Sequence, residues 1–167
     1  MNTAYVNIWN IRVGAIAWDD STGLGAFEFE PSFLKNRWDL APLKMPLAEA
    51  GGRIFYFSEL RNSKAFKGIP GLVADVLPDK YGNALINTWL TRRGRPADGM
   101  NPVETLCFIG KRGMGALEFE PAVPGMADSS TKIEIDDLVQ IANEILSGRH
   151  SFRADVSAHE EKAMLDI

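Results

Sequence analysis

The stretch that most constrains the fold of this chain is residues 71–83, GLVADVLPDKYGN, which spreads two glycines, one proline and two aspartates among apolar residues. Proline fixes one backbone angle and glycine reaches conformations that other residues avoid, so this combination predicts turns. Asp79 follows Pro78 at an expected helix start, where a carboxylate can bond free backbone amides. We predict a rigid turn into a helix, with structural roles for Asp75 and Asp79.

An amphipathic helix is expected from residue 79 roughly to residue 93. Its apolar residues recur at helical spacing. They are Tyr81, Leu85, Ile86, Trp89 and Leu90. Arg92 and Arg93 would lie at the negative C-terminal end of the helix dipole, and Gly94 supplies the stop.

A second helix has a clear beginning at residue 101. Asn101 is a good N-cap, Pro102 suits the first helical position, and Glu104 completes a capping box. Cys107, the single cysteine of the chain, lies in the apolar run that follows. We interpret it as a small buried apolar residue rather than a nucleophile.

Residues 110–115, GKRGMG, superficially resemble a loop that cradles phosphate. The glycine spacing fits neither the dinucleotide fingerprint nor the P-loop, and a strand rather than a helix is expected after Gly115. We therefore predict a structural turn at Gly113 and Gly115, with Lys111 and Arg112 as candidate contacts for an anionic partner.

The first third of the chain has the alternating pattern of β-strands. Residues 4–9 and 13–18 predict an antiparallel hairpin, and the polar cluster at 19–23 predicts a turn. Phe27 and Phe29 alternate with glutamates, which indicates a strand with one buried face and one solvated face.

Prolines and paired glycines predict an extended connection over residues 40–52, followed by a short strand over 53–57. A last helix is expected over 136–146. Residues 149–167 are polar and have the character of a linker or docking segment.

One short sequence nearly repeats. Residues 25–31, GAFEFEP, return as GALEFEP at 115–121. Because the flanking residues do not match, a duplication is doubtful. We interpret the repeat as two strands with the same alternation and the same proline stop, which could be neighbours in one sheet.

The net charge of −4 disfavours a broad nucleic-acid-binding surface, since neutralising phosphates needs clustered Lys and Arg. A basic patch would form only if two groups of residues converge, and solvated arginines are the simpler interpretation. The two groups are Arg92, Arg93 and Arg95, and Lys111 with Arg112.

No apolar run is long enough for a transmembrane helix, and the N-terminus has no signal-peptide pattern. His150 and His159 are nine residues apart in a polar segment, a poor pattern for a metal site. We therefore expect an acidic, soluble, cytoplasmic protein without a metal site.

The blocks at 71–82 and 101–121, with Trp9 followed by Val13 and Gly14, resemble the N-terminal region of HipA-family proteins, the serine/threonine kinase toxins of bacterial toxin–antitoxin pairs. The positions that carry the resemblance have structural or interaction roles. They are Gly71, Asp75, Pro78, Asp79, Gly82, Asn101, Pro102, Gly113 and Gly115.

The resemblance implies an α+β fold in which a small antiparallel β-barrel-like sheet is capped by helices, with a C-terminal helix and tail. We place the HipA-like N-terminal subdomain at residues 1–125, a linker and helix at 126–148, and a tail that would lead into a kinase core at 149–167.

The catalytic motifs of kinases are missing from this sequence: a glycine-rich loop ahead of a strand lysine, a His-Arg-Asp catalytic loop and an Asp-Phe-Gly motif. No catalytic, cofactor-binding or metal-binding residue is therefore predicted. ATP and Mg²⁺ are implied only for a parent kinase.

Two functions remain open. The chain resembles either a non-catalytic regulatory domain of a HipA-like kinase or a free-standing antitoxin-like module that neutralises a separate kinase. The expected partners are a kinase core, in cis or in trans, and a helix-turn-helix antitoxin that carries most operator contact. Residues 151–167 hold scattered apolar residues, so the isolated chain is expected to expose an apolar docking surface and to self-associate or show a mobile C-terminus. Specific DNA binding and membrane binding are not expected.

Overall fold

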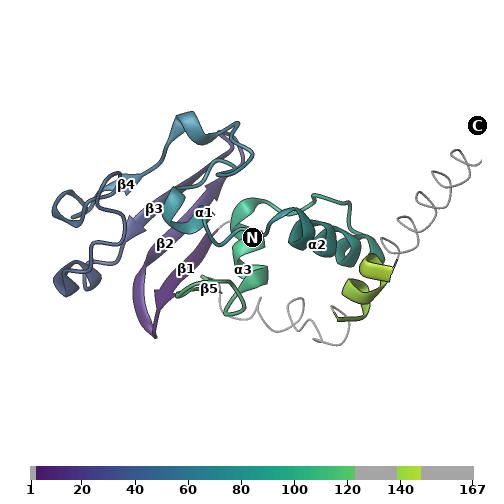
Figure 1. The fold of residues 1–167 in the computed structure, drawn as a ribbon. Coiled ribbons are helices and arrows are strands. Elements are labelled where there is room, and N and C mark those ends of the chain that lie inside the picture. The colour runs from purple at the N-terminus through teal and green to yellow at the C-terminus, as the bar shows by residue number, and fades with distance from the viewer. Residues whose placement is uncertain (1–2, 123–138, 148–167) are drawn as a thin grey trace, which may run out of the picture. The chain divides into compact units, whose positions relative to one another are not determined.

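The computed structural model describes two stretches of the chain, residues 3–122 and residues 139–147 (Figure 1). The described residues divide into two compact units. Residues 3–77 and 100–122 belong to the first unit, and residues 78–99 and 139–147 belong to the second. The chain thus leaves the first unit after Leu77 and returns to it at Met100.

Several predicted features lie outside the described residues. They are the tail over 149–167 with His150 and His159, the docking segment over 151–167, and the beginning of the helix expected over 136–146.

The first unit is built on one antiparallel sheet of five strands (Figure 1). The strands are β1 (Thr3–Ile8), β2 (Ile11–Asp19), β3 (Leu24–Phe29), β4 (Ile54–Phe55) and β5 (Leu117–Pro121). Their order in the sheet is β4-β3-β2-β1-β5.

The sheet is open, with β4 and β5 at its two edges. The predicted combination of helices with an antiparallel sheet is present. The predicted barrel-like character is not confirmed, because within residues 3–122 no ladder joins the two edges of the sheet. Since β4 pairs through only two residues, it offers too short an edge for such closure.

The predicted hairpin is formed by β1 and β2. Trp9 and Asn10 connect the strands with positive φ angles of 47° and 64°. Two left-handed residues give the turn whose twist matches the right-handed twist of paired strands. The second strand begins at Ile11, two residues before the predicted start.

The polar cluster at 19–23 forms the predicted turn between β2 and β3. The carboxylate of Asp19 accepts hydrogen bonds from the Ser21 amide at 2.9 Å and from the Ser21 hydroxyl at 2.6 Å. These bonds, with those from Thr22, lower the pKa of Asp19 because they favour its charged form. Gly23 closes the turn with a φ of +66°.

The strands that share the GA-x-EFEP pattern, β3 and β5, belong to the same sheet but are not neighbours. Both β2 and β1 lie between them. The expectation of adjacent strands is therefore wrong. Their common alternation reflects only that each strand turns one face to the core, with Phe27 and Phe29 buried in β3 and Phe119 in β5.

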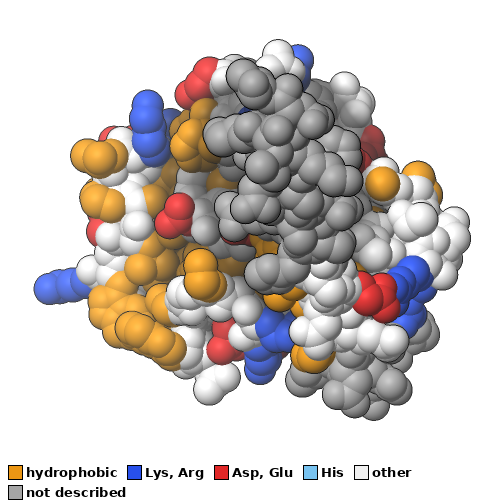
Figure 2. Space-filling model, turned by 45° about the vertical axis from the view of Figure 1, so that its right-hand side comes forward, with side chains coloured by type: hydrophobic (Ala, Val, Ile, Leu, Met, Phe, Trp, Pro, Cys, Tyr) orange, Lys and Arg blue, Asp and Glu red, His pale blue; other side chains and the backbone are white. Residues whose placement is uncertain are grey.

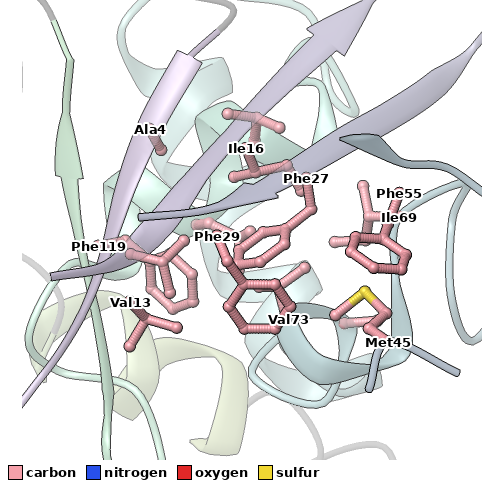
Figure 3. Close-up of a cluster of buried hydrophobic side chains, with 14 of the residues drawn as sticks. Ala4, Val13, Ile16, Phe27, Phe29, Met45, Phe55, Ile69, Val73 and Phe119 are labelled. Atoms are coloured by element: carbon pink, nitrogen blue, oxygen red, sulfur yellow. The ribbon is translucent and has the colours of Figure 1, made fainter. Parts of the chain in front are cut away.

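The core of the first unit lies between the sheet and the segments that cover it (Figure 3). Inward-facing side chains of β1, β2 and β3 pack with residues of two helices, α1 (Gly71–Ala74) and α3 (Pro102–Ile109). Helix α3 contacts β1, β2 and β5. The aromatic centre is Phe29, whose ring contacts the rings of Phe27, Phe33 and Phe55.

The long connection from β3 to α1 contains three short 3₁₀ helices rather than extended chain alone. They are η1 (Phe33–Asn36), η2 (Leu47–Glu49) and η3 (Ser58–Leu60). The strand expected over 53–57 is reduced to Ile54–Phe55, because only these residues pair with β3.

The second unit contains α2 (Lys80–Arg92) and the helix formed by residues 139–147. The bounds of α2 agree with prediction to within one residue. Its buried residues are Ile86, Trp89 and Leu90, whereas Tyr81 and Leu85 are only partly buried. None of the helices in the described stretches is long and apolar enough to cross a membrane.

Candidate functional site

The motif at residues 71–83 contains two structural devices in the second unit. Asp79 is the N-cap of α2, and its Oδ1 accepts a hydrogen bond from the Gly82 amide at 2.8 Å. A Cβ on Gly82 would lie 2.7 Å from the Cβ of Pro78, so glycine at this position lets the proline pack against the first turn. Asp75 is exposed and lies at the C-terminal end of α1.

Replacing Asp79 by alanine is expected to lower the free energy of unfolding by about 1 kcal/mol, because the Gly82 amide loses its acceptor. Asp79→Asn is the matched control, since asparagine caps helices equally well. Urea unfolding followed by circular dichroism measures both. An unchanged unfolding curve with loss of partner binding would instead make the motif a recognition loop.

The capping box predicted at Asn101 is confirmed. Its side chain accepts a hydrogen bond from the Glu104 amide at 2.8 Å, and the Glu104 carboxylate accepts one from the Asn101 amide at 3.1 Å. Pro102 occupies the first turn as expected. These contacts fix the start of α3, which carries Leu106 into the core.

Cys107 is buried on α3, as predicted. Burial raises the pKa of its thiol to about 11, which leaves very little reactive thiolate at neutral pH. The cysteine thus has the properties of a packing residue.

The glycines before β5 form a turn of the first unit. A Cβ on Gly113 would lie 2.5 Å from the Val76 side chain, and Gly115 has a φ of +115°. Both positions therefore favour glycine. The turn is held by a hydrogen bond from Arg112 Nη2 to the Phe108 carbonyl oxygen at 2.6 Å, and Lys111 pairs with Glu118 at 3.6 Å.

Four of the basic residues singled out from the sequence are divided between the two units. In the second unit Arg92 pairs with Glu144, and the Arg93 guanidinium lies over the Trp89 ring, 4.5 Å from its centroid. Lys111 and Arg112 belong to the first unit. Each of the four has an intramolecular partner, and contact with an anionic partner stays a prediction.

An apolar groove of about 500 Å³ lies in the first unit and was not predicted. Its walls come from residues 40–45, from Phe57, Glu59 and Leu60, and from Phe66, Gly71 and Leu72. Lys44 and Glu59 are its only charged lining residues. A concave apolar surface with few polar groups is the usual form of a binding site.

The groove is built by turns that are tied to the core. Met45 is 1% exposed, and its amide donates to the Ala41 carbonyl oxygen at 2.9 Å. On the other wall the Ile69 amide donates to the Phe66 carbonyl oxygen at 3.0 Å. At the rim, Leu43 is 93% exposed. The walls are therefore fixed, while large apolar side chains remain accessible to a ligand.

Gly71 is the one family-motif position that lines this groove. A Cβ there would lie 3.3 Å from the Phe66 ring, so glycine lets α1 begin close against the wall. The sequence held one usable signal for the groove. Residues 40–47, LAPLKMPL, are strongly apolar although they have no helix or strand period.

Other exposed apolar side chains belong to the same unit, among them Ile54 of the edge strand β4 and Tyr56 directly after it. Figure 2 shows hydrophobic side chains gathered at the left of the view, with Lys and Arg side chains beside them. Contiguous exposed apolar surface marks sites of interaction. Within residues 3–122 and 139–147, no group of three or more His, Cys, Asp or Glu could hold a metal ion.

The first unit is thus a small α+β unit with an exposed apolar groove. The family model of the HipA N-terminal domain matches residues 4–120, well over half of the chain. The chain therefore belongs to the HipA N-terminal domain family. No match was found among curated proteins.

Proposed function

We propose that this chain is a non-catalytic interaction domain that binds and regulates a HipA-like serine/threonine kinase core. The family match over residues 4–120 is the observation that carries the proposal. The apolar groove and the exposed hydrophobic side chains of the first unit support it, since they supply surface for a protein partner.

The kinase core can be joined to the domain in two ways. In cis it would follow in the same polypeptide, and the domain would regulate the parent kinase. In trans it would be a separate protein, and the domain would act as an antitoxin that neutralises it. A helix-turn-helix antitoxin as a further partner and a cytoplasmic location belong to the same proposal.

The coding sequence after the Ile167 codon separates these arrangements. An in-frame glycine-rich loop and catalytic aspartate would place the kinase in cis, whereas a stop codon followed by a kinase gene would place it in trans.

The binding test uses the full chain and a HipA-type kinase core that lacks its own N-terminal domain. We expect a complex in size-exclusion chromatography with light scattering, and a changed rate of kinase autophosphorylation when the chain is added. Absence of a complex at about 100 µM, together with an unchanged rate, would contradict the proposal. It would mean that the free energy of binding is no more favourable than about −5 kcal/mol.

A further expected result is that the isolated chain binds neither ATP nor Mg²⁺. Its sequence lacks the loop, the lysine and the acidic residues that cradle phosphates and hold the metal ion. Isothermal titration calorimetry of the chain with Mg-ATP checks this, with the kinase core as positive control. Micromolar binding by the isolated chain would be the contrary result.

A further inference from the structure

We propose that the groove of the first unit binds an acidic amphipathic segment of a partner protein, in which large apolar side chains are flanked by Asp or Glu. The inference deepens the proposed function, because it gives the chemistry of a partner for this interaction domain. It rests on that function only for the statement that the domain has a protein partner.

The apolar part of the ligand follows from the walls of the groove. Lys44 and Glu59 are the only charged lining residues, and the volume of about 500 Å³ falls in the range that holds substantial ligands. Burying polar groups against such walls would cost free energy without compensating hydrogen bonds. The side chains that enter the groove must therefore be apolar.

The acidic part follows from the charges around the groove. Residues 40–72, which span all of its walls, carry five basic and two acidic side chains, a net charge of +3 in a chain whose net charge is −4. Glu49 and Arg53 neutralise each other through a pair at 2.6 Å, which leaves four basic side chains and one acidic side chain, that of Glu59. Basic character is thus concentrated in the segment that builds the groove.

Four of these basic side chains are exposed. Arg53 pairs with Glu49, and the other three alternate in sequence with the walls. Lys44 follows the rim residue Leu43, while Arg61 and Lys64 lie between the wall residues Leu60 and Phe66. Positive charge around an apolar depression favours association with apolar anchors that have carboxylates on either side. A uniformly apolar ligand would offer no carboxylate to these three cations.

The experiment selects 16-residue peptides from a random phage-displayed library on the immobilised full chain. Enriched peptides are then synthesised, and their dissociation constants are measured by fluorescence anisotropy at low and high salt. Two variants test the groove. Leu43→Glu places a carboxylate at the rim, and Lys44→Glu reverses one charge of the lining.

Matched controls are available in the same unit. Met114 is 92% exposed and Lys35 is exposed, and neither lines the groove. Met114→Glu and Lys35→Glu therefore repeat the two chemical changes elsewhere. Because all four side chains are exposed, the variants should keep the wild-type circular dichroism spectrum.

We expect enriched peptides that combine apolar anchors with Asp or Glu. Leu43→Glu and Lys44→Glu should each weaken their binding about tenfold, and high salt should weaken it further. The control variants should stay within about twofold of the wild type.

Three results would overturn the inference: no enrichment, enriched peptides without acidic residues, or binding that the two groove variants leave unchanged. In a parallel experiment, binding of the chain to vesicles of about 70% phosphatidylcholine and about 30% phosphatidylserine is measured. The peptide and vesicle experiments are both done at about 0.1 M salt. Vesicle binding that is lost in the groove variants, without peptide enrichment, would assign the surface to a membrane instead. The kinase-core assay on the wild-type chain decides the proposed function separately.

Discussion

Replacing Phe29 by alanine is expected to lower the free energy of unfolding of the first unit by about 3–5 kcal/mol. The side chain is 2% exposed. Its ring centroid lies 4.9 Å from that of Phe27, 6.1 Å from Phe33 and 6.0 Å from Phe55. Truncation would remove three aromatic contacts and leave a cavity whose walls belong to two strands and a 3₁₀ helix, which cannot all collapse into it.

The matched control is Tyr56→Ala, which removes a similar ring from a side chain that is 64% exposed. Its effect should stay within about 0.5 kcal/mol. Urea unfolding followed by circular dichroism measures both variants. A loss below about 1 kcal/mol for Phe29→Ala would mean that the core tolerates the cavity, contrary to the packing described above.

Replacing Gly14 by alanine is expected to cost about 2–3 kcal/mol, although the change adds only a methyl group. Gly14 lies in β2 opposite Val6 of β1 and Phe29 of β3. A Cβ at this position would lie 2.2 Å from the Glu28 carbonyl oxygen and 2.9 Å from the Phe27 ring. Since the carbonyl belongs to a paired strand, the methyl group could be accommodated only by shifting the backbone of β3.

Gly51→Ala is the control with the opposite expected sign. A Cβ there meets nothing within 4 Å, and Gly51 is not among the glycines with positive φ. Restricting the unfolded chain should stabilise this variant by about 0.4–1 kcal/mol. If Gly14→Ala were also stabilising, this result would contradict the close approach between β2 and β3 described above.

Local features of this fold were predictable because their energetics lie within a few residues. The capping box of Asn101 and Glu104, the N-cap at Asp79 and the hairpin of β1 and β2 each depend on short-range contacts that a sequence displays directly. The burial of Cys107 could be predicted in the same way, because its neighbours in the sequence are apolar.

Strand order was not predictable in the same way. The repeated pattern in β3 and β5 describes which face of each strand is buried, and it contains no information about which strand lies alongside. The predicted barrel-like character of the sheet was not confirmed, because the pairing of β4 stops after Ile54 and Phe55.

The groove could not be derived from one sequence window. Its walls come from three segments between Leu40 and Leu72 that have no common period. They meet only because hydrogen bonds within turns, such as those of Met45 and Ile69, fold a long connection back on itself. Pattern analysis detects helices and strands, and this surface is made mostly of neither.

The pairing of β1 with β5 has a consequence for how the protein folds during its synthesis. Val6 lies opposite Phe119, so a strand made at the start of synthesis waits for one made more than a hundred residues later. At ribosomal rates of about 5–20 residues per second, that wait lasts roughly 6–20 s. During this time β1 has β2 on one side and an open edge on the other, where a second nascent chain could pair. Helix α3, which contacts β1 and emerges just before β5, would shorten the exposure of the apolar face but not of the edge.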